Sequence, residues 1–215
     1  DYIIKFTKMG IQVDHSSFLT SSVATASFLK ERYGEQLLYV LGTKSFAKEL
    51  RKYGLNVTEE VQESYKKDIV AAVVGFDNEL DYKKVETICE LLQTTNIEYW
   101  ATNPDLACPV SYGYIPDCGA ICNLLKEAVK REPIYLGKPN RLMVDMACIA
   151  GGYALEETIV IGDRLYTDIA CGINAGVDTV VVFTGEAKYE DLETTEFPPT
   201  YYCDTIKDLY ITLKD

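Results

Sequence analysis

The stretch TIVIGDRLYTDIACGINAG, residues 158–176, joins an apolar β-branched run to a helical pattern and places two carboxylates at the junction. Gly162 ends the apolar run and lets the backbone turn sharply beside a ligand. Asp163 and Asp168 follow it. In open α/β sheets, ligands bind where the carboxyl end of a strand meets the amino end of a helix. The stretch therefore predicts an α/β fold with a ligand site at this point.

The two carboxylates indicate a magnesium site. Mg²⁺ prefers one or two carboxylates, several waters and an oxygen of a substrate phosphate. Asp163 is expected to bind the metal directly, and Asp168 to hold a metal-bound water or to orient a lysine. The alternative is that Asp163 is a turn residue and Asp168 only a partner of the helix dipole. The stretch alone leaves both interpretations open.

Capping and stop signals mark two helices near these residues. Thr167 is expected to be the N-cap of a helix that ends at Gly176. Pro139 suits the first turn of an earlier helix, where its missing N–H costs nothing. Gly151 and Gly152 supply the stop signal of that helix.

Apolar runs alternate with amphipathic stretches along the whole chain. This alternation predicts mainly parallel strands joined by helices. A last short strand and a helix over residues 205–210 are expected near the end. The predicted strands lie in LLYVL, DIVAAVVGF, IEYWAT, PIYLG, TIVIGD and DTVVVF, and the other predicted helices include residues 81–93 and 139–150.

Lys138 follows the run PIYLG and precedes a helical pattern, so it is expected at the same edge of the sheet as Asp163. A lysine there can neutralise a phosphate and hold an anionic nucleophile during phosphoryl transfer, in which electrostatics and positioning supply most of the catalysis. A solvated surface lysine is the alternative. However, Gly-Lys-Pro followed 25 residues later by Gly-Asp-x-x-x-Thr-Asp is a joint pattern that chance seldom produces. The pattern favours a catalytic role for Lys138.

Composition and charge narrow the class of protein. The chain has 215 residues, enough for one large domain or two small ones, and a formal net charge of −12 that disfavours nucleic acid as a partner. Its seven cysteines show no framework-like spacing, which indicates reduced thiols in a cytoplasmic protein. No run approaches 18 apolar residues, so no membrane span is expected.

Two long segments resemble motifs III and IV of the haloacid dehalogenase (HAD) superfamily phosphatases. They are YLGKPNRLMVDMA, residues 135–147, and TIVIGDRLYTDIACGINAGVDTVVVFTG, residues 158–185. The chain is most similar to the NagD-like, p-nitrophenylphosphatase-like subfamily with an α/β (C2-type) cap. The resemblance covers essentially all of the chain and includes FLTSSVATASFLKE, YWATNPDLACP and IPDCGAIC.

The resemblance implies a Rossmann-like core with a parallel sheet, residues 1–34 and 131–215, and an inserted α/β cap, residues 35–130. It implies a Mg²⁺-dependent phosphomonoesterase that acts on a small phosphorylated metabolite through an aspartyl-phosphate intermediate. Lys138 would take the role of the motif III lysine. Asp163 and Asp168 would hold Mg²⁺, and Asp168 would also serve catalysis.

The first and second motifs of the family do not occur in this chain. The first, Asp-x-Asp-Gly at a strand end, supplies the nucleophile, and the second supplies a phosphate-binding Ser or Thr. Both are expected upstream of residue 1, so the chain by itself is expected to be an inactive fragment. Asp77 ends an apolar strand much as the first motif does, but no second aspartate or glycine follows in the required pattern. It is expected to be a turn residue.

The resemblance assigns the choice of substrate to the cap. The loop ATNPDLACPVSYGYIPDCG offers Asn103, Asp105, Cys108 and Tyr112 as substrate contacts. Relatives specific for pyridoxal phosphate have a histidine at the place aligned with Cys108, so that substrate is disfavoured here. A turn built by Asn103-Pro104-Asp105 without substrate contact is an equal alternative.

Two function classes remain from the sequence. The first is the phosphatase; the second is a non-catalytic phosphate-binding or interaction protein with the same fold. A homodimer formed through the cap is a further hypothesis. Cys118 and Cys122 have i,i+4 spacing on a predicted helix, and a zinc site would need two more ligands. They are therefore interpreted as small buried residues.

Overall fold

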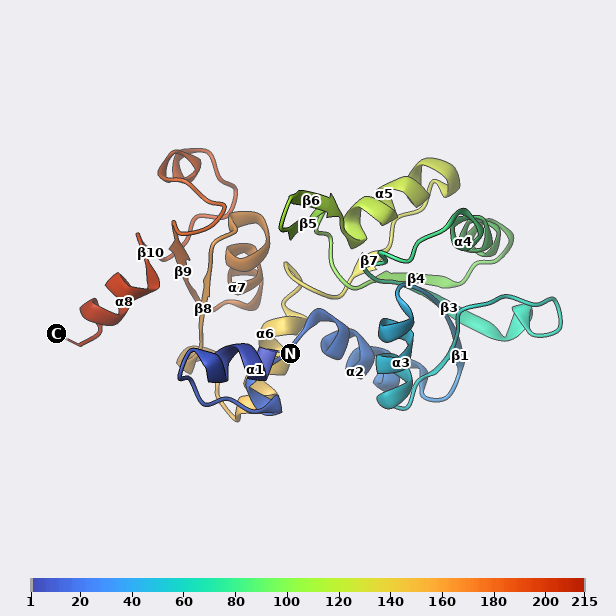
Figure 1. The fold of residues 1–215 in the computed structure, drawn as a ribbon, viewed down its shortest axis with the longest axis horizontal. Coiled ribbons are helices and arrows are strands. Elements are labelled where there is room, and N and C mark those ends of the chain that lie inside the picture. The colour runs from blue at the N-terminus through green and yellow to red at the C-terminus, as the bar shows by residue number, and fades with distance from the viewer. Residues whose placement is uncertain (1, 215) are drawn as a thin grey trace. The chain divides into compact units, whose positions relative to one another are not determined.

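A computed structural model of the chain describes residues 2–214, apart from the side chains of Tyr2 and His15. The chain divides into a first unit, residues 1–20 with 139–215, and a second unit, residues 21–138. Helices alternate with mainly parallel strands in both units, which confirms the predicted α/β fold (Figure 1). The division of the chain into a catalytic core and a cap stays a prediction.

The second unit is built on a five-stranded sheet in the order β2-β1-β3-β4-β7, with all its strands parallel. Its strands β1, β3, β4 and β7 lie in four of the predicted runs, which confirms those predictions. The elements of this unit are α2 (Ser21–Tyr33), β1 (Leu37–Leu41), α3 (Lys44–Lys52), β2 (Asn56–Thr58), a 3-10 turn (Lys66–Asp68), β3 (Ile69–Val74), α4 (Tyr82–Thr94), β4 (Glu98–Ala101), β5 (Ala107–Val110), β6 (Gly113–Pro116), α5 (Cys118–Val129) and β7 (Ile134–Tyr135).

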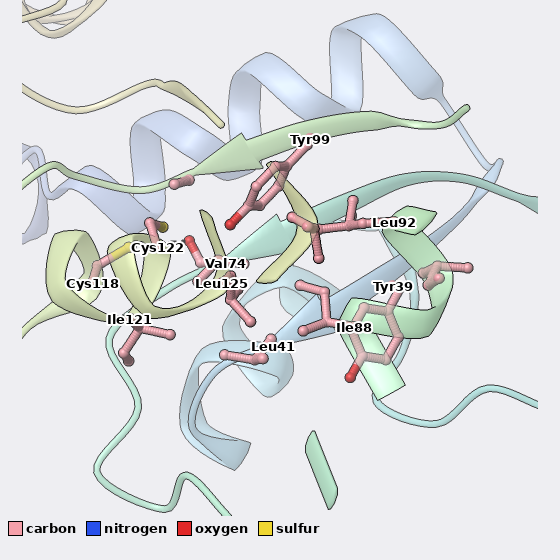
Figure 2. Packing of buried hydrophobic residues seen from close by; sticks show 14 of the residues in the cluster. Tyr39, Leu41, Val74, Ile88, Leu92, Tyr99, Cys118, Ile121, Cys122 and Leu125 are labelled. Carbon is pink, nitrogen blue, oxygen red and sulfur yellow. Dashed lines mark hydrogen bonds between the residues drawn. The ribbon is translucent and has the colours of Figure 1, made fainter. Parts of the chain in front are cut away.

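Both faces of this sheet are covered, as a parallel sheet requires. Helices α4 and α5 pack on one face, where Ile88, Leu92 and Leu125 meet Tyr39 and Val74 of the strands (Figure 2). Each aliphatic side chain fully buried here contributes about 1.5–3 kcal/mol of hydrophobic stabilisation. Cys118 and Cys122 lie on the same face of α5 and are buried in this cluster, which confirms their interpretation as small core residues.

Trp100 of β4 packs the sheet against helix α2. Its ring packs edge-on against Phe28 of α2, and its indole Nε1 donates a 2.7 Å hydrogen bond to the hydroxyl of Tyr33. That hydroxyl in turn donates to Glu98. The buried polar atoms of this aromatic contact are therefore satisfied, as burial demands.

The first unit contains a three-stranded parallel sheet in the order β10-β9-β8. Val144 and Cys148 of α6 pack with Cys171 and Ala175 of α7 beside Val160 of β8. The predicted late strand and helix are confirmed as β10 and α8. The elements are α1 (Tyr2–Lys8), a 3-10 turn (His15–Ser17), α6 (Leu142–Gly151), a 3-10 turn (Leu155–Glu157), β8 (Ile159–Gly162), a π-helical turn (Leu165–Ile169), α7 (Ala170–Ala175), β9 (Asp178–Val182), a 3-10 turn (Tyr189–Glu193), β10 (Tyr201–Cys203) and α8 (Ile206–Thr212).

Two helix starts differ from the predictions, whereas the predicted stops are confirmed. Helix α6 begins at Leu142 instead of Pro139, because the side chain of Asn140 accepts the N–H of Leu142 at 3.0 Å and forms a turn first. The C-caps Gly152 and Gly176 have φ values of 71° and 79°, in the left-handed region that glycine adopts without strain.

Thr167 is not an N-cap, because the helical turn already begins at Leu165. The N–H of Ile169 reaches the carbonyl of Arg164 at 3.1 Å, which is the i to i−5 bond of a π-helix. Asp168 caps this turn in place of Thr167, since its carboxylate accepts the N–H of Arg164 at 3.2 Å. Thr167 itself is buried inside the turn. The observed start thus depends on a side chain four residues downstream.

Candidate functional site

Asp163 lies directly after β8, and its side chain is held by the loop that follows the neighbouring strand β9. Its Oδ2 accepts the N–H of Glu186 at 3.0 Å, and its carbonyl accepts the N–H of Ala187 at 2.9 Å. A Cβ at Gly185 would lie 1.9 Å from this Oδ2, so only glycine leaves room for the carboxylate. Two parallel strand ends therefore position Asp163 jointly.

Asp168 is buried in the π-helical turn, with 8% of its surface exposed. Its carboxylate lies against the end of the same strand, since a Cβ at Gly162 would be 2.2 Å from the Asp168 Cβ. The structure thus brings Asp163 and Asp168 to one loop at the carboxyl end of β8. A buried carboxylate beside a half-buried one concentrates negative charge there.

An ion pair that the sequence did not predict ties the two loops together. Arg164 Nε lies 2.7 Å from Glu186 Oε2. The two residues line a cavity of about 410 Å³ whose other walls include Tyr166 and Phe197. A Thr-Gly-Glu sequence directly after an apolar strand was the only local signal for Glu186.

The carboxylate pair fits a hard divalent cation. It consists of oxygen donors only, and the two carboxylates lie so close to Gly162 and Gly185 that a Cβ at either glycine would overlap them. Within residues 2–214, no group of three or more His, Cys, Asp or Glu side chains is placed to hold a metal ion. A cation bound at Asp163 and Asp168 would therefore need waters or substrate oxygens as its other ligands, which is the usual mode of Mg²⁺.

A prediction follows for Gly185. In the full-length gene product, Gly185→Ala is expected to displace the Asp163 carboxylate, because the added Cβ would overlap its Oδ2. A displacement of this size should lower phosphate release on the order of tenfold to a hundredfold. Melting curves should change little, since the loop is at the surface. Normal activity and an unchanged Mg²⁺ requirement would show that the position of Asp163 is unimportant.

The strand before Lys138 does not share a sheet with the strand before Asp163, so the prediction of one common sheet edge is wrong. Strand β7 pairs with β4 in the second unit, whereas β8 pairs with β9 in the first. The reason is that β4 and β7 are joined by one parallel crossover, which consists of the hairpin β5–β6 and α5, and strands joined in this way usually pair with each other. A phosphate-binding role for Lys138, which lies in the turn after β7, stays a prediction.

Of the four predicted substrate contacts, two build a turn and two lie on a hairpin. Asn103 Nδ2 donates to Asp105 Oδ2 at 3.0 Å, and this turn packs so closely on α5 that a Cβ at Gly119 would be 2.1 Å from the carbonyl of Pro104. Cys108 lies on β5, and Tyr112, 81% exposed, lies between β5 and β6. Their contact with substrate stays a prediction.

The thiol of Cys108 is poorly suited to nucleophilic chemistry. Partial burial raises its pKa, and the nearby carboxylates of Asp117 and Asp105 raise it further. The thiolate is the reactive form of cysteine, so a raised pKa keeps the side chain protonated and inert near neutral pH.

Asp77 has a structural environment. Its Oδ1 accepts the N–H of Glu79 at 2.8 Å, and its Oδ2 lies 2.8 Å from Lys84 Nζ. Lys84 also donates to the carbonyl of Gly42 at the end of β1. The side chain closes the turn after β3, in agreement with the expected turn role.

Comparisons with known proteins point to one family. A family model described as HAD-hydrolase-like matches residues 135–209, and one described as haloacid dehalogenase-like hydrolase matches residues 1–56. An acid sugar phosphatase of Staphylococcus epidermidis is 30% identical over 98% of this chain and 78% of its own length. The ribonucleotide monophosphatase NagD of Escherichia coli is also 30% identical, over 97% of this chain and 79% of its own.

Solved structures agree with these sequence matches. The crystal structure of 4-nitrophenylphosphatase from Thermotoga maritima superposes with a TM-score of 0.86 and 35% sequence identity. That match covers 97% of this chain and 77% of the other. NagD from Escherichia coli superposes with a TM-score of 0.83 and 29% identity, over 96% of this chain and 78% of the other.

Proposed function

Because the chain belongs to the haloacid dehalogenase-like hydrolases and is a phosphatase of that family, we propose that it is the larger part of a Mg²⁺-dependent phosphomonoesterase. The reaction passes through an aspartyl phosphate, with the nucleophilic aspartate upstream of residue 1. The observation that carries this proposal is the pair of carboxylates, Asp163 and Asp168, at the carboxyl end of β8.

Asp163 and Asp168 of the first unit and Lys138, the last residue of the second unit, have different roles. Asp163 binds Mg²⁺ through its carboxylate, which also accepts the N–H of Glu186. Buried Asp168 fixes the loop by accepting the N–H of Arg164, and it places a second negative charge beside the metal. Bound Mg²⁺ would polarise the phosphoryl oxygens and neutralise charge that develops in the transition state. Lys138 neutralises the phosphate and steadies the nucleophile.

The substrate class is a small phosphorylated metabolite. Named activities of the relatives include acid sugar phosphatase, ribonucleotide monophosphatase and 5'-nucleotidase, all of which act on phosphate esters of small molecules. The second unit supplies Asn103, Asp105, Cys108 and Tyr112 as contacts to the leaving group. Among the described residues no cysteine forms a disulfide, which suits a reducing compartment such as the cytoplasm. No described helix is long and apolar enough to cross a membrane.

A phosphate-release screen of the full-length gene product tests this proposal. The panel contains sugar phosphates, nucleoside monophosphates, glycerol phosphate and p-nitrophenyl phosphate, each with Mg²⁺ and with EDTA. Turnover that requires Mg²⁺ and leaves a phosphorylated aspartate in a quenched reaction is the expected result. Absence of turnover on the whole panel, or turnover that is indifferent to EDTA, would contradict the proposal.

Replacement of Asp168 should be less damaging than loss of a direct metal ligand. In the full-length gene product, Asp168→Asn keeps an oxygen that can accept the N–H of Arg164 but removes a charge beside the metal. Changes in groups that orient metal ligands typically cost about 10–100-fold in metal affinity or activity. A Mg²⁺ titration should therefore show a weaker apparent affinity and partial recovery of rate at high Mg²⁺. Full activity at low Mg²⁺ would exclude this role.

A further inference from the structure

The ion pair between Arg164 and Glu186 joins the two loops that hold the Asp163 carboxylate. Arg164 follows Asp163 in the loop after β8, and Glu186 lies in the loop after β9. The Arg164 Nε and the Glu186 Oε2 are 2.7 Å apart. Among the described residues, Arg164 is the only ion-pair partner of the Glu186 carboxylate. The pair therefore fixes the second loop to the first through side chains.

Glu186 acts on Asp163 through its backbone. Its N–H donates to Asp163 Oδ2 at 3.0 Å, and the next N–H, that of Ala187, donates to the Asp163 carbonyl at 2.9 Å. No described residue forms a hydrogen bond with the other carboxylate oxygen, Oδ1. The loop after β9 thus fixes one oxygen of Asp163 and leaves the other for a cation.

Arg164 is fixed in turn by its backbone contacts with the second carboxylate. Its N–H donates to Asp168 Oδ2 at 3.2 Å, and its carbonyl accepts the N–H groups of Asp168 and Ile169 at 3.0 and 3.1 Å. Because Asp168 and Ile169 are buried in the π-helical turn, the backbone of Arg164 has a firm support. The ion pair extends this support to the exposed loop that contains Glu186.

The loop after β9 needs such a support. Gly185 and Glu186 are both exposed, and glycine has more backbone freedom than any other residue. An exposed loop with this freedom samples other conformations unless further contacts hold it. With the ion pair formed, the contacts close a ring from Asp163 through Arg164 and Glu186 back to Asp163.

The ion pair also balances charge beside the proposed metal ligand. A guanidinium on the residue next to Asp163 repels a divalent cation, and the carboxylate of Glu186 neutralises it. Loss of Glu186 and loss of Arg164 therefore have opposite electrostatic effects on a bound cation. Their effects on the position of Asp163 are the same, because either loss opens the ring.

We propose that Arg164 and Glu186 are positioning residues for Mg²⁺ binding. Their ion pair holds the N–H of Glu186 on Asp163 Oδ2 and so keeps Oδ1 turned toward the cation. The inference rests on the proposed function, since it takes Asp163 and Asp168 as the Mg²⁺ site. In this role the pair sets the affinity for Mg²⁺ and leaves the rate of the metal-loaded protein unchanged.

Calorimetric titration of the full-length gene product with Mg²⁺ tests the proposal in Glu186→Gln, in Arg164→Gln and in the double variant. Each single variant should bind Mg²⁺ about tenfold more weakly, at the lower end of the range of about 10–100-fold for groups that orient metal ligands, because Glu186 is partly exposed. The double variant should lose no more than either single variant, since each of them already breaks the pair. If charge alone mattered, Arg164→Gln would bind Mg²⁺ more tightly, and the double variant, with unchanged net charge, would bind it normally.

Two further measurements separate positioning from a general loss of structure. In a Mg²⁺ titration of phosphate release, the single variants should need more Mg²⁺ but reach the same maximal rate. In EDTA, the N–H of Ala187 should exchange with solvent deuterium faster in both single variants, because the loop after β9 is released. This exchange measurement needs neither metal nor turnover.

Glu156→Gln and Lys207→Gln are the matched controls in the same unit. They remove the same charges from exposed positions, and Glu156 precedes β8, at the opposite end of the strand from Asp163. Both should keep the Mg²⁺ affinity of the unsubstituted protein. Melting curves of all variants in EDTA should lie close to that of the unsubstituted protein, because partly exposed ion pairs contribute little to stability.

The inference would be overturned by unchanged Mg²⁺ affinity in either single variant, by normal affinity in the double variant, or by an equal loss in the controls. A lower maximal rate at saturating Mg²⁺ would also overturn it, because the pair would then act on the chemical step. Asp163→Asn, titrated beside these variants, tests the metal site itself. If it alone loses Mg²⁺ binding, the proposed function stands and only the role of the ion pair fails. If it binds Mg²⁺ normally, the proposed metal site fails and the inference fails with it.

Discussion

Replacing Asp163 by asparagine is expected to lower phosphate release by the full-length gene product about a hundredfold or more, and to weaken its affinity for Mg²⁺ at the same time. The substitution removes a negative charge from the metal site while nearly preserving the shape of the side chain. Because the amide oxygen can still accept the N–H of Glu186, the loop after β9 should keep its place. The loss should therefore be one of metal binding and not of folding.

The measurement is a Mg²⁺ titration of activity beside melting curves recorded without metal. Asp178→Asn is the matched control, since Asp178 is an exposed aspartate at the start of β9. Its activity and melting temperature should equal those of the unsubstituted protein. Near-normal activity of Asp163→Asn at low Mg²⁺ would make Asp163 a structural residue. A loss of activity that results only from unfolding would also make Asp163 a structural residue.

The second large effect concerns stability. Lys84→Met is expected to destabilise the second unit by about 3 kcal/mol, because it leaves a buried carboxylate without its cation. The side chain of Asp77 is fully buried, and the Lys84 ammonium 2.8 Å away is its only ion-pair partner among the described residues. A single N–H from Glu79 would remain to stabilise the charge.

Urea unfolding followed by tryptophan fluorescence measures this effect, since the chain has one tryptophan, Trp100, and it lies in the same unit. Lys83→Met is the matched control on the same helix. Its ion pair with Glu86 is largely exposed to solvent, so its loss should change the free energy of unfolding little.

The double variant Lys84→Met with Asp77→Asn separates charge from packing. Removal of the unpaired charge should restore much of the lost stability, because the neutral amide is far less costly to bury. Equal unfolding free energies for the Lys83 and Lys84 variants would show that the pair contributes nothing. Loss of catalysis by Asp77→Asn in a folded protein would instead make Asp77 a catalytic residue.

Parts of the fold and of the site were predictable because their causes lie close together in the sequence. The apolar β-branched runs became β1, β3, β4, β8 and β9, and glycine in the left-handed region ended α6 and α7. The placement of Asp163 and Asp168 after one strand was likewise a local property, since the strand, the glycine and both acids fall within ten residues.

Other features were decided only by the tertiary structure, because they depend on residues far apart in the chain. The sequence could not show that β7 pairs with β4 instead of joining the sheet of β8. Nor could it show that Gly185 and Glu186, which follow Asp163 by 22 and 23 residues, lie against its carboxylate. A cavity of about 540 Å³, lined by Thr43 after β1 and Gly75 after β3, likewise exists only once the strand order is set. The spacing of apolar residues shows which face of a helix or strand is buried. It does not show which other element covers that face or pairs with that strand, because this depends on segments that are distant in the sequence.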